Sequence, residues 1–369
     1  MTTGTTATEQ AAGPDRPAPK KRVTSFDAFR GIAIILVVFA HATGFGWGFQ
    51  DKPGALNFFN LYYSVFMRNL ALFSLPLFLL ISGYWLGKSE FHTRGDYWMF
   101  LRKRVSRIAV PYLFWSVFFL SLYAVKDALA GESTFSVGGF LLAIALGKAD
   151  GPYYFILLIL QFYVLAPFFC RVGRSTRGMA AMIALHALVI AALYYVRFFY
   201  APDLSYIAVK LPFLAWLSIF PAGVYLRHHP KVMDRGGAGL FAGLALLLLV
   251  LEMAESAVLL ETGFHYEFGI SDIRVSSILY AFSVVFFFVK FRDREWPQVL
   301  VTFGEYAFGI FFIHGIVLRT FAKGFAPLFA VQPAYQTAIS LSTLAVCCLV
   351  IFGTRRVVGR GFSSRFLGF

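Results

Sequence analysis

Long apolar runs alternate with short polar segments along almost the whole chain. A helix needs about 20 apolar residues to cross the hydrocarbon core of a bilayer, and this length picks out about ten segments. The candidate spans are residues 29–49, 62–87, 108–125, 152–170, 179–200, 204–226, 237–260, 274–291, 299–318 and 334–353. A shorter apolar stretch, 135–147, is expected to be re-entrant or interfacial. The pattern predicts an all-α polytopic membrane helical bundle of about ten transmembrane helices.

Composition supports this class and excludes others. Hydrophobic residues make up 59% of the chain and charged residues only 14%, whereas soluble domains average about 45–50% apolar and about 25% charged. The apolar runs are continuous, while the strands of a membrane β-barrel alternate in hydrophobicity. The cysteines, Cys170, Cys347 and Cys348, lie inside or at the end of apolar runs. We therefore predict neither a disulfide framework nor a metal site.

The net charge of +14 reflects topology. When loops are assigned to alternate sides, most Lys and Arg residues fall on the side of the N-terminal tail. The few on the other side are Lys52, Lys126, Lys148, Arg319 and Lys323. Because cytoplasmic loops carry the positive excess, both termini are expected in the cytoplasm, and nucleic acid is not an expected partner. The predicted organisation is a disordered basic cytoplasmic tail (1–24), a membrane domain (25–355) and a second basic cytoplasmic tail (356–369).

Some charged residues lie inside or at the edge of the spans, where a charge is costly and marks a candidate site. The cations are Arg30, Arg68, Arg197, Lys210 and Arg274, and the carboxylates Glu252 and Glu255 could neutralise two of them. One interpretation is a set of buried ion pairs. The other is an outward-open acceptor chamber formed by Arg68, Lys210, Arg274, Glu252 and Glu255, which would suit a glycan bearing phosphate or carboxylate.

The first span carries one polar stripe. Arg30 and His41 are eleven residues apart, which returns to within about 20° of the same helix face, and His41 is about 16 Å deeper. Asp27 is the i, i+3 neighbour of Arg30 on the same side. Alone, Arg30 could snorkel to the interface and His41 could form a helix-to-helix hydrogen bond. Their shared face favours a functional site.

Two further arginines lie at the entry to the third span. Arg104 and Arg107 are i, i+3 neighbours, so their guanidinium groups lie side by side and suit bidentate contacts to phosphate. A basic cluster at this position is also what the predicted topology requires.

Several motifs occur in a fixed order. They are Asp27-x-x-Arg30-Gly31 followed by His41, Ser82-Gly83-Tyr84, Arg104-x-x-Arg107-Ile108 with Pro111-Tyr112-x-x-Trp115, Tyr163-x-x-x-Pro167, and Gly309-Ile310-x-x-x-His314. Together they resemble the acyltransferase-3 family of integral-membrane enzymes with a ten-span core, over about residues 25–355. Two positions depart from the family pattern. Pro152-Tyr153-Tyr154-Phe155 replaces a His-x-Trp-Phe-like opening of the fourth span, and Glu305-Tyr306-Ala307-Phe308 stands where many members have a Ser.

The resemblance implies transfer of an acyl group, usually acetyl, from cytoplasmic acyl-CoA to a hydroxyl of a sugar or cell-envelope glycan. It implies a multi-pass protein of the inner (cytoplasmic) membrane, in contact with lipid, whose acceptor could be anionic or lipid-linked. The family's functional residues map to Arg30, His41, Arg104 and Arg107. The departures put the identity of the acceptor in question more than the type of reaction.

Acyl transfer to an alcohol needs a general base, and His41 is the candidate. The family suggests an Asp–His pairing, which makes Asp27 a catalytic candidate. Asp27, however, is about 21 Å from His41 along one helix, so we expect it to pair with Arg30 or with the Arg104–Arg107 pair. A partner for His41 could then come from another span, and His314 lies at a similar depth, as either a catalytic or a packing histidine.

Negative charge develops on the thioester oxygen during transfer, so this oxygen needs a hydrogen-bond donor. Ser82 and Tyr84, beside the expected acyl-CoA site, are the candidates. An alternative function is a secondary transporter or flippase for an anionic glycan or lipid, although the two halves of the chain show no similarity to each other. A second alternative is a non-catalytic lipid-binding or sensory protein.

Overall fold

The computed structural model describes residues 24–43, 55–132, 135–201, 206–261 and 266–369. Within these ranges the chain forms helices and no strand, which confirms the predicted all-α class. The tail predicted at 1–24 lies outside the described residues except for Thr24, as does the end of the first predicted span.

The helices follow one another with short connections. Their bounds are α1 Ser25–Ala42, α2 Ala55–Ala71, α3 Ser74–Leu86, α4 Arg94–Leu129, α5 Val137–Ala145, α6 Tyr154–Val164, α7 Ala166–Gly173, α8 Thr176–Phe199, α9 Tyr206–Lys210, α10 Ile219–His228, α11 Pro230–Asp234, α12 Ala238–Glu261, α13 Tyr266–Gly269, α14 Val275–Val289, α15 Gln298–Gly324, α16 Gln332–Val358 and α17 Arg360–Phe362. Single turns are η3 Gly151–Tyr153, η4 Phe213–Trp216, η5 Ala326–Leu328 and the π-helical η6 Ser363–Leu367.

The described residues contain seven helices that are long and apolar enough to cross a membrane. They are Ser25–Ala42, Phe58–Leu86, Arg94–Leu129, Thr176–Phe199, Ala238–Glu261, Gln298–Gly324 and Gln332–Val358. An eighth segment, Gly151–Val164 with Ala166–Gly173, bends by 70°. Two predicted spans are shorter helices here, α10 in 204–226 and α14 in 274–291. The count of about ten and the sides of the termini stay predictions.

The segment predicted as a continuous span at 204–226 is broken for an identifiable reason. Pro212 has no N–H to donate, and α9, η4 and α10 follow one another with changes of direction. Broken backbone at this depth needs other partners. Gln161 of α6 supplies them, because its Nε2 donates to the Leu211 carbonyl (2.8 Å) and its Oε1 accepts from the Phe213 N–H (3.1 Å). Trp216 Nε1 donates to the Lys210 carbonyl (2.8 Å).

Two close helix crossings hold the centre of the bundle. Where α1 meets α15, a Cβ added to Gly31 would lie 2.0 Å from the Leu300 carbonyl oxygen, and one added to Gly304 would lie 1.7 Å from the Asp27 carbonyl oxygen. Only glycine allows the two backbones to approach this closely. Glycines 83 and 223 form the equivalent crossing of α3 and α10. The glycines of two of the sequence motifs are therefore packing residues.

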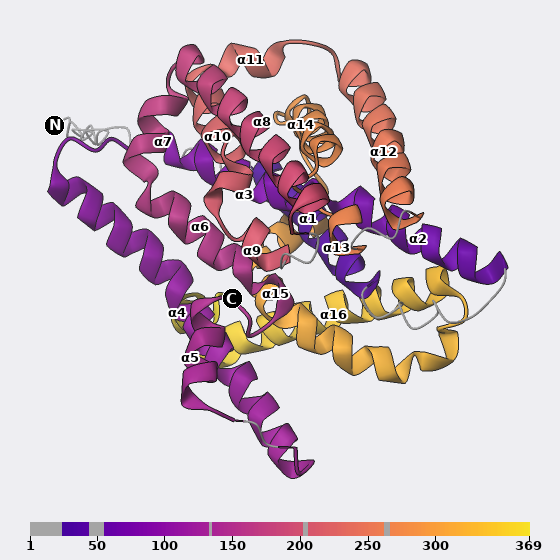
Figure 1. Ribbon diagram of the computed structural model, residues 1–369. Coiled ribbons are helices and arrows are strands. Elements are labelled where there is room, and N and C mark those ends of the chain that lie inside the picture. Colours follow the sequence, from indigo (N-terminus) through magenta and orange to yellow (C-terminus); the bar gives the residue numbers. More distant parts are fainter. Residues whose placement is uncertain (1–23, 44–54, 133–134, 202–205, 262–265) are drawn as a thin grey trace, which may run out of the picture.

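The bundle surrounds α1, which packs most extensively against α15. In Figure 1, α15 and α16 (orange to yellow) lie side by side along one border, with α12 and α4 at others. The short α5, within the stretch predicted as re-entrant or interfacial, buries none of its residues.

The C-terminal segment folds back onto the bundle. Residues 356–369 were expected as a basic tail, but α16 continues to Val358, and α17 and η6 then turn towards α4. Trp115 Nε1 donates to the Leu367 carbonyl (3.0 Å), and Phe369 is buried against the Trp115 ring. The marked C-terminus in Figure 1 accordingly lies among α4, α5 and α15.

Candidate active site

A cavity of about 1130 Å³ opens at the centre of the bundle. Residues of α1, α2, α3, α4, α6, α9, α15 and α16 line it, together with residues of η3, of the segment between α13 and α14, and of the C-terminal segment. The residues predicted from the sequence that line the cavity are Arg30, His41, Arg68, Ser82, Arg104, Arg107 and Lys210. The cavity therefore joins groups from both ends of the polar stripe on α1.

The end of the cavity nearest the start of α1 is rich in guanidinium groups. Arg30 forms an ion pair with Asp27, as expected, and its Nε donates to the Phe26 carbonyl (3.4 Å). Arg104 lies 5.9 Å from the ring centroids of both Phe100 and Tyr163. Arg107 is exposed and also lines the cavity. This end is suited to a ligand with more than one phosphate group.

Two further cations line the same cavity, and sequence reasoning counted them only as topological charges. Lys88 Nζ lies 4.4 Å from the centroid of the Trp85 ring, and Arg355 at the end of α16 lies 4.6 Å from that of Tyr306. The Nε of Arg355 is buried and has no hydrogen-bond partner. The positive-inside bias hid these residues, because every span end on that side carries such a charge.

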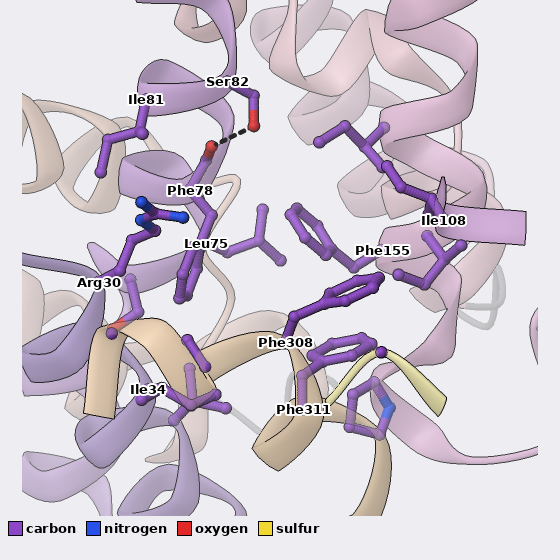
Figure 2. Close-up of a pocket in the computed structure, with 18 of the residues that line it drawn as sticks. Arg30, Ile34, Leu75, Phe78, Ile81, Ser82, Ile108, Phe155, Phe308 and Phe311 are labelled. Carbon is purple, nitrogen blue, oxygen red and sulfur yellow. Dashed lines mark hydrogen bonds between the residues drawn. The ribbon is translucent and has the colours of Figure 1, made fainter. Parts of the chain in front are cut away.

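Aromatic and aliphatic side chains line the middle of the cavity. Figure 2 shows the rings of Phe155, Phe308 and Phe311 together between Arg30 on one side and Ile108 on the other. Phe155 lies 5.9 Å from Phe311, edge to face. Ser82 points its hydroxyl back to the Phe78 carbonyl of its own helix (2.8 Å), also visible in Figure 2. This middle section suits an uncharged chain better than a charged group.

His41 lies beside His314, with the ring centroids 5.2 Å apart and the planes at 49°. This contact follows from the helix crossing. Gly31 and Gly304 meet, and each histidine is ten residues, about 15 Å, further along its helix. The two helices run in the same direction, so equal steps keep the side chains level. The predicted similarity in depth is confirmed.

His314 has one ring nitrogen in use and one without a partner. Its Nδ1 faces the carbonyls of Ile310 (3.0 Å) and Phe311 (2.9 Å), which only accept, so Nδ1 donates. In the neutral ring Nε2 is then an acceptor. This atom is buried and makes no hydrogen bond.

Asp150 is a residue that sequence reasoning missed. It lies against α15, where a Cβ added to Gly315 would lie 2.1 Å from its Oδ2. Oδ1 accepts from Arg319 Nη2 (2.9 Å) and from the Gly151 N–H (2.9 Å), while Oδ2 is buried without a partner. Its place as the N-cap of η3, directly before the span that departs from the family pattern, was the only sequence signal.

The other end of the cavity carries Arg68 and Lys210. Arg68 Nη1 donates to the Ala40 carbonyl (3.4 Å), next to His41 in the chain. Lys210 forms a buried ion pair with Asp272 and lies 4.9 Å from the centroid of the Tyr154 ring. Asp272, rather than Glu252 or Glu255, is thus the carboxylate beside Lys210.

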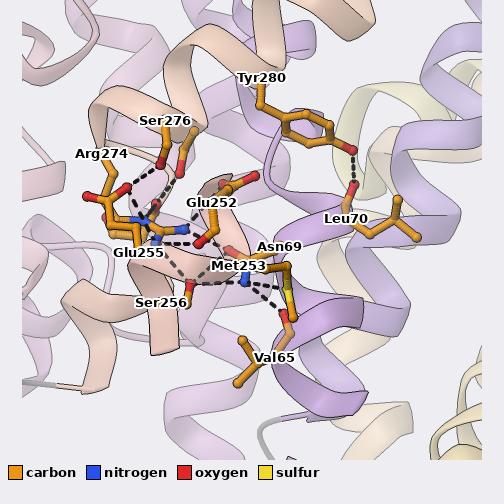
Figure 3. A network of polar contacts seen from close by, with 12 residues as sticks. Val65, Asn69, Leu70, Glu252, Met253, Glu255, Ser256, Arg274, Ser276 and Tyr280 are labelled. Carbon is orange, nitrogen blue, oxygen red and sulfur yellow. Dashed lines mark hydrogen bonds and ion pairs between the residues drawn. The ribbon is translucent and has the colours of Figure 1, made fainter. Parts of the chain in front are cut away.

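Arg274, Glu252 and Glu255 lie in a separate polar network that does not line the cavity (Figure 3). Arg274 and Glu252 are fully buried. The Arg274 guanidinium donates to Asn69 Oδ1 (2.7 Å), Ser256 Oγ (2.9 Å), the Ser271 carbonyl (3.1 Å) and both the carbonyl and Oε1 of Glu252 (3.3 Å each). All five N–H groups have partners, and Glu255 Oε2 lies 3.8 Å from Arg274 Nη1. Arg274 and Glu252 thus form a buried ion pair, as in the first interpretation, with the partly exposed Glu255 beside them, and the network joins α2, α12 and the start of α14.

Three other predicted residues also lie outside the cavity lining. Tyr84 accepts a hydrogen bond from Arg227 (3.3 Å) and packs on Phe26, Asp27 holds Arg30, and His314 lies behind His41. In the part of the chain that the structure describes, no group of three His, Cys, Asp or Glu residues could hold a metal ion.

Comparison with known proteins places this arrangement in a family. The sequence profile of the acyltransferase-3 family, described as an acyltransferase domain, matches residues 23–352. The chain belongs to this family. It is 27% identical over 260 residues to "Putative membrane-bound acyltransferase YfiQ" of Bacillus subtilis (strain 168), covering 67% of this chain and 68% of that protein. No solved structure matches. The protein is thus a multi-pass membrane acyltransferase. Membership of this family favours an enzyme over the alternative function of a transporter or flippase.

Proposed function

We propose that this acyltransferase moves an acyl group, acetyl in the first instance, from cytoplasmic acyl-CoA to a hydroxyl of a sugar or cell-envelope glycan, in the inner membrane of the cell. The observation that carries the proposal is that one cavity has a guanidinium cluster at one end and His41 further in. Acyl-CoA has several phosphates at one end and a long, uncharged arm that carries the thioester. This order matches the order of guanidinium groups, apolar rings and His41 along the cavity.

In this proposal Arg30, Arg104 and Arg107 hold the phosphates of CoA. Guanidinium groups bind phosphate oxygens bidentately, and Asp27 keeps the Arg30 side chain in place from the i−3 position. The pantetheine arm passes the phenyl rings of the middle section. The separation of about 16 Å between Arg30 and His41 along α1 is the reason for assigning phosphates and thioester to different ends.

The reaction exchanges a thioester for an oxygen ester. The acceptor hydroxyl oxygen attacks the thioester carbonyl carbon, His41 takes the hydroxyl proton, the C–S bond breaks, and the CoA thiolate leaves and receives a proton. His314, with its unpaired Nε2, stands behind His41 as its orienting partner, and the carboxylate of Asp150 lies against Gly315, the next residue of α15. The Ser82 hydroxyl donates to the Phe78 carbonyl. To donate a hydrogen bond to the thioester oxygen instead, the hydroxyl has to rotate away from that carbonyl.

Release of free CoA thiol tests the proposal. The purified protein in detergent is incubated with acetyl-CoA, with and without a panel of glycans, and thiol release is followed together with the acetyl-CoA-dependent shift of the melting temperature. We expect a thermal shift with acetyl-CoA alone and faster thiol release with the correct acceptor. The absence of both effects, with acetyl-CoA and with longer acyl-CoAs, contradicts the proposal.

A further inference from the structure

The cations at the two ends of the cavity serve different groups. Arg68 donates to the carbonyl of Ala40, so it lies at the depth of His41 and not at that of Arg30, which is about 16 Å away along α1. If CoA phosphates bind at Arg30, Arg104 and Arg107, its thioester lies near His41, and none of its phosphates is left for Arg68. The Arg68 guanidinium must therefore face something other than the donor.

Arg68 has donors to spare. Its one hydrogen bond, 3.4 Å to a carbonyl, is long, and among the described residues no carboxylate lies within ion-pair distance of it. Arg274, on the same side of the bundle, uses all five N–H groups within the protein. A guanidinium left with free donors inside a membrane cavity is costly unless a ligand supplies the acceptors.

The charged side chains around Arg68 do not neutralise its guanidinium. Lys210 lines the cavity at the same end, and Asp272 balances it in a buried pair. Among the described residues that line this end, Arg68 is then the cation that no carboxylate balances. Since Ala40 and His41 are adjacent in the chain, a group bound to Arg68 is held directly beside the proposed base.

We propose that the acceptor carries one anionic group, a carboxylate or a phosphate, and that Arg68 binds this group while His41 receives the hydroxyl. The proposal rests on the proposed function and adds the chemical class of the acceptor. Lys210 supports the same anion from its position beside Asp272. An uncharged acceptor of the same shape would leave the guanidinium unpaired, so the site discriminates by charge.

The experiment compares acceptors that differ only in charge. The probes are a methyl hexoside, the methyl hexuronide of the same stereochemistry, and the corresponding hexose phosphate glycoside. Acetyl-CoA-dependent thiol release and the shift of the melting temperature without acetyl-CoA are measured for each. Wild type is expected to favour an anionic probe over the hexoside by about tenfold or more, as a charge-assisted hydrogen bond allows. Which anion gives the larger effect distinguishes carboxylate from phosphate.

Arg68→Gln should abolish this preference and leave the KM for acetyl-CoA unchanged. Arg68→Lys should retain part of the preference, which keeps the test valid if the glutamine variant does not fold. Lys323→Gln is the matched control, because Lys323 is exposed at the end of α15 and does not line the cavity. It should behave as wild type.

Three results overturn the proposal. The first is an equal loss of rate with charged and uncharged acceptors in Arg68→Gln, which would assign Arg68 to the oxyanion of the reaction. The second is a raised KM for acetyl-CoA, which would assign it to the donor. The third is a wild-type protein whose melting temperature responds to none of the anionic probes. An anion-dependent shift without thiol release, in contrast, supports this site while contradicting the proposed function.

Discussion

Two groups of intramembrane charges in this protein look alike in the sequence and differ in the structure. Arg68 and Lys210 line the central cavity, whereas Arg274 lies outside it in a network with Glu252 and Glu255. In the network every donor of the arginine is bonded, while in the cavity Arg68 has one long bond. A charged residue inside the membrane can thus belong either to a binding site or to a network that holds helices together. The two cases differ in how many of its hydrogen-bond donors are already bonded within the protein.

The same contrast applies to two buried histidines. His186 on α8 uses both ring nitrogens, with Ser218 Oγ at 2.7 Å and the Ala215 carbonyl at 2.9 Å. His314 leaves Nε2 unpaired, and its neighbour His41 faces the cavity. His186 is therefore a packing residue, whereas the pair His41–His314 has the free ring nitrogen and the cavity contact that the proposed reaction requires.

The largest expected effect is on His41. His41→Ala should lower kcat for acetyl transfer by about 10²–10⁴-fold, because the proton of the acceptor hydroxyl loses its base. Thiol release with the identified acceptor measures it, and the melting temperature should change little. His186→Asn is the matched control and should lower stability while leaving activity per folded molecule near wild type. If His186→Asn abolishes transfer and His41→Ala does not, the two roles are reversed.

A large effect on stability is expected in the network. Arg274→Met should destabilise the protein by about 3–5 kcal/mol, since it leaves the buried Glu252 without its partner. Glu252→Gln in the same chain should recover part of this loss. Thermal unfolding in detergent measures both variants. If Arg274→Met is as stable as wild type but transfers the acyl group to the acceptor more slowly, this result would instead support the acceptor-binding role predicted from the sequence.

A moderate effect is expected at the guanidinium end of the cavity. Arg104→Ala or Arg107→Ala should raise the KM for acetyl-CoA by about tenfold or more, through the loss of a charge-assisted contact to phosphate. Arg102→Ala is the control, because Arg102 is exposed on the same helix and does not line the cavity. Equal effects of all three variants would indicate general electrostatic attraction rather than a binding site.

The smallest effect is expected for Tyr84. Tyr84→Phe should change the KM for acetyl-CoA by less than about twofold, because its hydroxyl bonds to Arg227 outside the cavity. Initial rates over a range of acetyl-CoA concentrations measure this. A tenfold rise in KM would return Tyr84 to the donor site, as the sequence motif suggests.

Much of the architecture could be predicted from hydropathy, because the bilayer imposes a length on each helix. The polar stripe predicted for α1 puts Arg30 and His41 on one helix face, and both residues line the cavity. The break at Pro212 was less accessible, since it depends on Gln161 and Trp216, which lie outside the local pattern.

Some of the site could not be predicted, because it depends on contacts between distant segments. Arg355 and Lys88 were counted among the flanking charges of the topology, and the sequence pattern did not single out Asp150. In the sequence, Arg274 and Arg68 look alike, because each is a charged residue within or beside an apolar run. Only three-dimensional packing shows which charge faces a cavity and which faces a carboxylate.

Because α1 and α15 cross in parallel, the number of residues between the glycine and the histidine must be the same in both helices for the two histidines to meet. Ten residues separate Gly31 from His41 and Gly304 from His314. One residue inserted into either interval would turn the following histidine by about 100° away from its neighbour. In each helix, the stretch between the glycine and the histidine is therefore expected to tolerate substitutions of side chains far better than any change in length.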